Sequence, residues 1–240
     1  MHPYWKVLAL NKGKGEFKAE KGADEATIYL YDSIVSSEDE AEWYGGVAPK
    51  SFINELKSID AKVINLRINS PGGSVFAARA MEQALREHSA KIVAHIDGYS
   101  ASAASFLMMA ADEIVMSPGA MVMIHKAWTM AYGNANDLMQ TADLLEKIDG
   151  TLVETYAART GKDASQIAEW MAAETWFTAS EAVEAGFADR ISESKAKAEK
   201  QWDLSAYANA PKQTEPQPEP EKAQVDVAAL LRRLSVRERI

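Results

Sequence analysis

Two segments of small residues, each following an apolar strand-like run, are the parts of this sequence whose residue types could do chemistry. The first, residues 69–73, reads Asn-Ser-Pro-Gly-Gly. Its two glycines allow a sharp turn and present backbone N–H groups, which stabilise a developing negative charge. Taken alone, the segment is better explained as a tight strand-to-helix turn, and no Gly-Lys-Ser/Thr follows that would indicate a phosphate loop.

The second segment, residues 98–105, reads Gly-Tyr-Ser-Ala-Ser-Ala-Ala-Ser. Small residues at such a junction let a hydroxyl protrude, as in a nucleophile elbow, although Gly-x-Ser-x-Gly is absent. A serine needs a base to take its proton, so this chemistry requires a histidine. His125 is favoured because it closes the apolar run 121–124, and catalytic groups gather at strand ends of α/β folds; the other histidines are His2, His88 and His95. A serine and a histidine at separate strand ends are by themselves a weak signal.

The elements that must position these residues follow from hydrophobic periodicity. We expect strands over 27–30, 63–68, 91–96, 113–116 and 121–124, and helices over 76–87 and 137–159. The first helix should turn Phe76 inward, and the second should be about 35 Å long. Thr178 and Glu181 form a capping box for a last short helix that Gly186 should end. This alternation predicts an α/β fold with a largely parallel sheet and flanking helices.

Composition restricts the classes of function. The 240 residues carry a net charge of −9, and 47% are hydrophobic, so the chain can bury a core but repels phosphate backbones and anionic lipids. We therefore expect no nucleic-acid or membrane partner. The absence of cysteine excludes disulfides, thiolate zinc sites and a cysteine nucleophile, and we expect no metal or organic cofactor. No apolar run reaches the ~20 residues of a membrane span, and none near Met1 fits a secretory signal, so a cytoplasmic protein is expected.

The C-terminal part differs in composition from the body. Four prolines fall within residues 211–220, among Glu, Gln and Lys, which is typical of an extended linker. Apolar residues at helical spacing return beyond it. We predict a folded domain over residues 1–200, a Pro/Glu-rich linker over 201–224 and an amphipathic helix over 225–240. The helix is either a frayed end or a docking element.

Four motifs in order resemble the ClpP-type serine peptidases. They are Ile-Asn-Ser-Pro-Gly-Gly at 68–73, Gly-x-x-x-Ser at 98–102, Met-Ile-His at 123–125, and Glu-Ala-x-Glu-x-Gly-x-x-Asp at 181–189. Each is weak alone, but the similarity runs in register from about residue 27 to residue 189. The resemblance implies a ClpP/crotonase-like fold, with parallel strands, flanking helices and the long helix at an oligomer interface.

The resemblance also implies a role for each matching residue. Ser102 takes the position of the nucleophile, His125 that of the general base, and the amides of Gly73 and Ala103 those of the oxyanion hole. The position of the third member, normally aspartate, holds Glu174, whose extra methylene changes its reach. The implied activity is that of a serine-type endopeptidase, ATP-independent or ATPase-assisted, that cleaves polypeptide through an acyl-enzyme.

Several positions depart from the housekeeping members of this family. Ala173 stands where those members carry an arginine that takes part in contacts between rings, residues 1–26 do not resemble an axial loop, and Trp43–Val47 has no counterpart. These features resemble the phage and prophage branch, associated with capsid maturation in the host cytoplasm or prohead. The expected partners are a capsid or scaffold protein, a Clp-type ATPase, and other copies of this chain in a ring-like homo-oligomer. We expect two such rings to stack less stably than in the housekeeping members.

Two alternatives from other classes stay open. A crotonase-related enzyme would share the fold and the paired N–H groups but act on acyl-thioesters without a Ser–His pair. A peptidase-derived assembly scaffold would have no turnover. Labelling of Ser102 by a fluorophosphonate probe separates both from a serine peptidase.

Overall fold

The computed structural model describes residues 3–193 and 202–211. The chain divides into two units, residues 1–210 and 211–240, and the account below concerns the first. The predicted amphipathic helix over 225–240 lies outside the described residues. No helix within the described ranges is long and apolar enough to cross a membrane.

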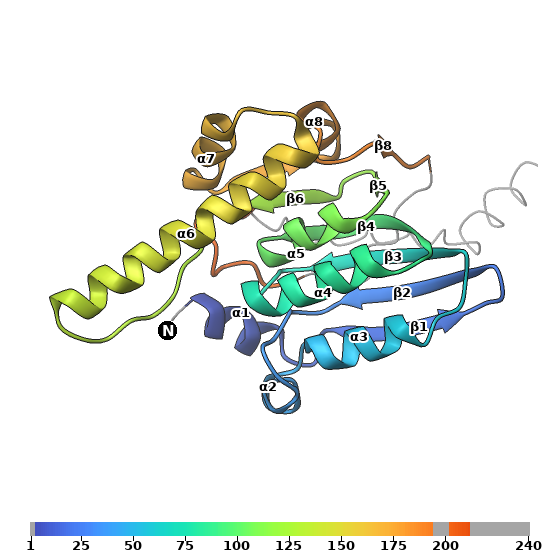
Figure 1. The fold of residues 1–240 in the computed structure, drawn as a ribbon, viewed down its shortest axis with the longest axis horizontal. Coiled ribbons are helices and arrows are strands. Elements are labelled where there is room, and N and C mark those ends of the chain that lie inside the picture. The colour runs from blue at the N-terminus through green and yellow to red at the C-terminus, as the bar shows by residue number, and fades with distance from the viewer. Residues whose placement is uncertain (1–2, 194–201, 212–240) are drawn as a thin grey trace, which may run out of the picture. The chain divides into compact units, whose positions relative to one another are not determined.

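A twisted, mainly parallel sheet forms the centre of the first unit (Figure 1), which confirms the predicted fold class. Neighbouring strands in its main path are β1-β2-β3-β4-β5-β8, and β6 joins β4 separately. Only the pairs β1–β2 and β6–β7 are antiparallel among the strands described. The strand bounds are β1 Glu16–Lys21, β2 Glu25–Tyr31, β3 Val63–Ser70, β4 Lys91–Ala101, β5 Glu113–Met116, β6 Met121–Ile124, β7 Thr175–Thr178 and β8 Arg190–Ile191.

Strand β4 is longer than its neighbours and changes partner along its length. Residues 93–96 pair with β5, whereas residues 99–101 pair with β6. The last register pair, Ala101 with Met123, comes one residue before Ser102 and two before His125. This fork therefore brings residues that are 23 apart in sequence to adjacent strand ends.

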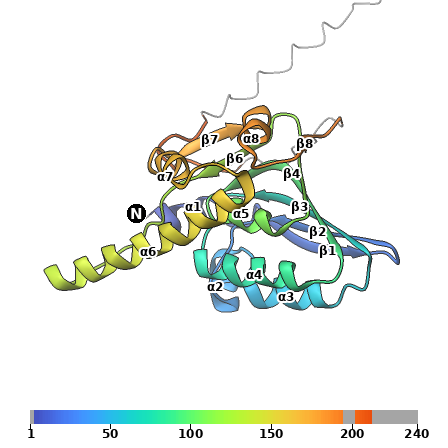
Figure 2. The same ribbon diagram turned by 45° about the horizontal axis from the view of Figure 1, so that its top comes forward.

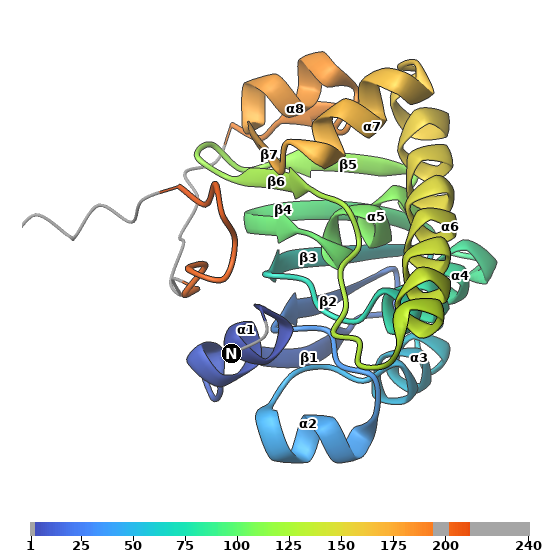
Figure 3. The same ribbon diagram turned by 90° about the vertical axis from the view of Figure 1, so that its left-hand side faces the viewer.

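Helices cover both sides of the sheet. In Figure 3, α3 (Pro49–Lys57), α4 (Val75–Glu87) and α6 (Ala135–Thr160) lie on one side, and α1 (Pro3–Asn11) and residues 202–211 lie on the other. Alternate residues of β2 and β3, such as Ile28 and Leu66, are fully buried between these layers. The remaining helices are α2 (Glu38–Tyr44), α5 (Ala103–Leu107), the 3₁₀ turn Met108–Ala110, α7 (Ala164–Ala172) and α8 (Ala179–Ala185).

Helix α6 is the longest element, and its two halves differ in environment. Asn134 and Asp137 form a capping box at its start, and Gly161 ends it in the left-handed conformation. Its only fully buried side chains are Leu152 and Tyr156, in the second half. The first half extends away from the sheet and the other helices (Figure 2), so most of its side chains face solvent.

Two sequence-based expectations differ from the structure. Phe76 is not inward but 67% exposed, because α4 buries the face that carries Ala78, Met81 and Leu85. The boundary predicted at residue 200 falls before a packed segment, since Trp202 and Leu204 are buried with Met123. The predicted cap of α8 is present, with Thr178 and Glu181 at its start and Gly186 at its end.

Candidate active site

Ser102 stands at a strained turn between β4 and α5. Its φ of 53° and ψ of −123° lie outside the regions that L-residues normally adopt. Gly72 makes the turn feasible, because a Cβ there would lie 2.3 Å from the carbonyl oxygen of Ala101. The Ser105 amide and hydroxyl both donate to the Ser102 carbonyl, at 2.9 and 2.6 Å, which fixes the turn from the helix side.

The structure brings Ser102 and His125 together. Nε2 of His125 lies 2.8 Å from Oγ of Ser102, and the Ser102 amide donates to the Met123 carbonyl at 2.9 Å. The second bond continues the β4–β6 pairing, so sheet register sets the distance between the two side chains. A serine hydroxyl hydrogen-bonded to an imidazole is the arrangement of an activated nucleophile and its base.

The imidazole of His125 is electrically suited to accept a proton. Burial lowers its pKa to about 4, and the nearby negative charge of Glu174 acts in the opposite direction. The ring is only partly buried at the cavity wall. Since the pKa lies below neutrality, the ring is neutral at pH 7, and a neutral imidazole has one nitrogen whose lone pair can accept a proton.

The backbone of Gly73 is fixed beside this pair by residue Ile34. The Ile34 amide donates to the Gly72 carbonyl at 2.8 Å, and the Ser74 amide donates to the Ile34 carbonyl at 2.9 Å. A Cβ at Gly73 would lie 2.0 Å from the Ile34 oxygen, so the position requires glycine. Neither the Gly73 amide nor the Ala103 amide has an acceptor within the described residues. Both are available to a developing oxyanion.

Glu174 lies near the pair but bonds to other groups. Its φ of 48° is again left-handed. Its carboxylate accepts from the Asn209 amide at 2.6 Å, the Ala208 amide at 3.0 Å and the Trp176 indole at 3.4 Å. Across the described part of the chain, no hydrogen bond joins Glu174 to His125, and Nδ1 of His125 has no hydrogen-bond partner. Its effect on His125 in this structure is electrostatic.

Residues 202–210 reach the site from the far end of the domain, which the sequence analysis missed. Tyr207 is buried, its ring is 5.6 Å from that of His125 at 82°, and its hydroxyl donates to the Pro71 carbonyl at 2.5 Å. Nε1 of Trp202 lies 3.0 Å from both the carbonyl and the side-chain oxygen of Asn69. The signal in the sequence was the group of large apolar residues directly before the prolines.

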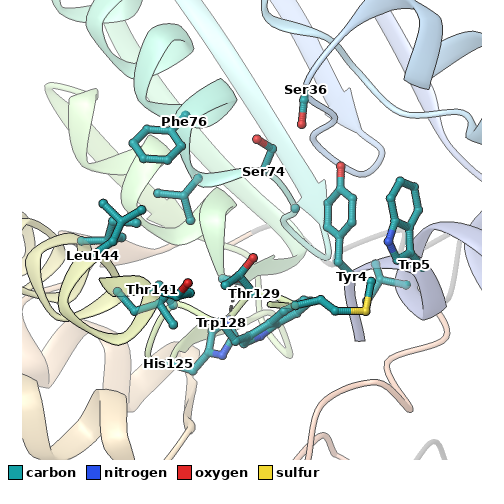
Figure 4. Close-up of a pocket in the computed structure, with 18 of the residues that line it drawn as sticks. Tyr4, Trp5, Ser36, Ser74, Phe76, His125, Trp128, Thr129, Thr141 and Leu144 are labelled. Atoms are coloured by element: carbon teal, nitrogen blue, oxygen red, sulfur yellow. Dashed lines mark hydrogen bonds between the residues drawn. The ribbon is translucent and has the colours of Figure 1, made fainter. Parts of the chain in front are cut away.

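A cavity of about 410 Å³ opens beside Ser102 and His125. Figure 4 shows Phe76 and Leu144 on one side of it and Tyr4 and Trp5 on the other, with His125 and Trp128 between them. Its lining is mainly apolar. The described residues contain no group of three or more His, Asp or Glu side chains that could hold a metal.

The sequence is similar to those of known proteins over most of this unit. The sequence profile of the Clp protease family matches residues 35–195. The chain is 34% identical over 159 residues to the ATP-dependent Clp protease proteolytic subunit 2 of Tropheryma whipplei, covering 62% of this chain and 88% of the relative. It is 33% identical over 165 residues to the ATP-dependent Clp protease proteolytic subunit of Bacteroides fragilis (strain ATCC 25285), covering 68% and 80%. A profile match over more than half of the chain, with relatives that align across most of their own length, shows that the chain belongs to the Clp protease family.

Proposed function

We propose that this protein is a serine endopeptidase in which Ser102 is the nucleophile and His125 the general base. The observation that carries the proposal is the 2.8 Å contact between Oγ of Ser102 and Nε2 of His125. Strain at Ser102 supports it, since unfavourable backbone geometry is retained where function requires it.

The reaction begins with attack of Ser102 Oγ on the scissile carbonyl. As the O–C bond forms, the serine proton passes to Nε2 of His125, and the carbonyl electrons move to oxygen. The amides of Gly73 and Ala103 then donate to this oxyanion. Amides held by the backbone need no reorganisation as charge develops, and a single donor of this kind contributes about 10²–10³ in rate.

The imidazolium next gives its proton to the departing amine as the C–N bond breaks, which leaves an acyl-enzyme on Ser102. Water attacks this ester with His125 again as base, and the tetrahedral intermediate collapses to the carboxylic acid and free serine. Glu174 stabilises the imidazolium through its negative charge, in agreement with its effect on the pKa of His125. We propose it as the third member on these grounds and on its position in the family motif.

The substrate class that fits the cavity is a polypeptide with a large apolar side chain near the cleaved bond. Phe76, Trp128 and Ile148 line the space next to Ser102. Burial of a large apolar side chain contributes about 1.5–3 kcal/mol to binding. A phage capsid or scaffold protein, and delivery by a Clp-type ATPase, stay predictions from the family resemblance, as does a cytoplasmic location.

We test the function with a fluorophosphonate probe and with hydrolysis of a peptide that has a quenched fluorophore. The wild type should be labelled at Ser102 and should cleave peptide. Ser102→Ala should abolish both labelling and peptide hydrolysis. His125→Ala should lower the rates of labelling and of hydrolysis, by on the order of 10⁶ if the two residues act as a unit. Acyl-thioester hydrolysis without labelling would instead favour the crotonase-related enzyme.

Ser100→Ala is the matched control. Ser100 is two residues away and fully buried, but its hydroxyl has no hydrogen-bond partner in the described residues. Its loss should leave labelling and hydrolysis near wild type. An inactive Ser100→Ala beside an active Ser102→Ala would overturn the assignment, and an unlabelled, inactive wild type would favour the scaffold.

A further inference from the structure

Residues 202–210, here called the strap, contact His125, Glu174 and the glycine loop of the candidate site from one segment of chain. Tyr207 packs on His125, and the amides of Ala208 and Asn209 bond to Glu174. Trp202 and Tyr207 also bond to the loop that carries Gly73. The strap is itself tied down elsewhere, because Asn11 of α1 exchanges hydrogen bonds of 2.7 and 3.0 Å with Asp203.

We propose that the strap completes the catalytic site and that Tyr207 is a positioning residue for His125. The inference rests on the proposed function, in which His125 is the base. It assigns a role to a segment that lies beyond the family match, which ends at residue 195.

The first argument is the hydrogen bonding of the imidazole. His125 makes one hydrogen bond, through Nε2 to Ser102, and Nδ1 has no partner in the described residues. A single bond at Nε2 fixes one ring atom but leaves the tilt of the ring about that atom weakly restrained. The Tyr207 ring meets it edge to face at 5.6 Å, and Trp128 lies at 6.2 Å, so ring packing holds the orientation that a carboxylate would otherwise fix.

The second argument is the charge of Glu174. Two strap amides donate to its carboxylate, at 2.6 and 3.0 Å. These two bonds hold in place the carboxylate whose charge acts on His125. The Asn209 side chain adds a bond to the Ala173 carbonyl at 2.8 Å, which fixes the backbone at the same turn.

The third argument is the geometry of the glycine loop. The Tyr207 hydroxyl bonds to the Pro71 carbonyl, two residues before the Gly73 amide, and Trp202 bonds to Asn69 at the end of β3. The strap thus holds the loop at Asn69 and Pro71, whereas Ile34 holds it at Gly72 and Ser74. It does not block the site, because Tyr207 lines the cavity together with Ser102.

Replacement of Tyr207 in the full chain tests the proposal by two independent measurements. The first is the pKa of His125, from NMR titration of its ring protons, and the second is kcat and KM for the quenched peptide. Tyr207→Leu keeps buried apolar volume without the aromatic edge, and Tyr207→Phe keeps the ring without the hydroxyl. Tyr29→Leu is the matched control, because Tyr29 contacts Lys18 and Glu20 on the sheet, away from the cavity.

We expect Tyr207→Leu to raise the pKa of His125 by about one unit. Water then reaches the imidazole, so burial lowers the pKa less, while the charge of Glu174 still raises it. The kcat of this variant should fall about 10²-fold, as for a catalytic group misplaced by ~1 Å, with KM changed less. Tyr207→Phe should restore the pKa of His125 almost to wild type, and its kcat should lie between those of Tyr207→Leu and the wild type, because the bond from the hydroxyl to the Pro71 carbonyl is lost. An unchanged pKa and kcat in Tyr207→Leu, or equal losses in Tyr29→Leu, would overturn the proposal. If the wild type hydrolysed nothing, the proposed function would fail, and the titration would still decide whether Tyr207 shields His125.

Discussion

At the scale of single residues, the position of the nucleophile depends on an unusual backbone conformation at Ser102. Ser102 adopts a positive φ because Gly72, without a Cβ, lets the two turns approach to van der Waals contact. The glycine loop and the serine turn therefore act as one unit.

This unit can be tested by Gly72→Ala with Gly119→Ala as control. Both glycines have nearly the same φ, 85° and 84°. An alanine in this left-handed conformation should therefore lower the free energy of unfolding by a similar amount in both variants, about 1–2 kcal/mol. Only the alanine at 72 would also meet the Ala101 oxygen and the Ser102 Cβ, at 2.3 and 2.8 Å, whereas nothing lies within 4 Å at 119. We expect peptide hydrolysis to fall by at least about 10²-fold in Gly72→Ala alone. Equal rates in the two variants would contradict this coupling.

The pKa of His125 predicts how activity and stability depend on pH. Its folded value is lowered towards about 4 from the ordinary 6.5. The base therefore stays neutral in mild acid, and kcat/KM at pH 5.5 should remain above half of its maximum. Because the unfolded chain binds more protons between these values, the free energy of unfolding should decrease as pH falls through that window, by up to about 3 kcal/mol.

Urea denaturation at a series of pH values measures the second effect. His125→Gln removes the titrating group, so its difference from wild type isolates the contribution of His125 from that of His95, whose pKa is also lowered by burial. A difference that does not change between pH 4 and 7 would contradict the lowered pKa.

At the scale of elements, Arg79 connects the three helices beneath the cavity. From α4 it donates to Glu82 at 2.7 Å, to Thr155 on α6 at 2.9 Å and to the Thr151 carbonyl at 3.1 Å. Its guanidinium also lies 4.6 Å from the ring centre of Phe106 on α5. The arginine thereby fixes α6 against the helix that follows Ser102.

Arg79→Ala should lower the free energy of unfolding by about 2 kcal/mol or more, because it leaves the buried Glu82 carboxylate with Arg86 as its remaining ion-pair partner. Chemical denaturation measures this loss. Lys62→Ala removes the ion pair with Asp24, whose side chains are 84% and 77% exposed, and should cost less than about 1 kcal/mol. Similar losses in the two variants would mean that Arg79 is solvated like a surface residue.

Elements with strong local signals could be predicted from the sequence. Strands β5 and β6 have the predicted bounds, because each is a short apolar run closed by a turn or a polar residue. The continuation of β4 through residues 97–101 was not predictable, since pairing with β3 and β6 overrides the low strand propensity of Asp97, Gly98 and Ser100. Strand β1 was missed because its alternating charged residues resemble a solvated loop.

At the site too, residues with a local sequence signal could be predicted, whereas residues placed by contacts distant in sequence could not. Ser102 and His125 were predicted to act together, and the strand fork supplies the distance that no local pattern contains. Tyr207 was not predictable as part of the site, because its contacts with His125 and Pro71 span 82 and 136 residues. Their roles in catalysis stay predictions until activity is measured.

At the scale of the whole molecule, the first half of α6 carries more exposed apolar surface than a single copy should present to water. Leu138, Met139 and Leu144 are 46%, 63% and 52% exposed. Three other apolar residues of this helix do not belong to the exposed face, because Leu145 and Ile148 line the cavity and Leu152 is buried. An apolar face of this kind marks a contact with another protein, and we expect that protein to be a second copy in a ring-like assembly.

Leu138→Glu combined with Met139→Glu should therefore reduce the particle mass measured by light scattering. Peptide hydrolysis should fall with it, because Leu144, Leu145 and Ile148 of the same helix form part of the cavity wall and lose their support. Gln140→Glu combined with Lys147→Gln is the matched control, since it also changes the charge by −2 on exposed positions of the same half-helix. It should keep the wild-type mass. A wild type that is a fully active monomer at micromolar concentration would show that α6 needs no partner, and the exposed apolar residues would then have to serve substrate binding instead.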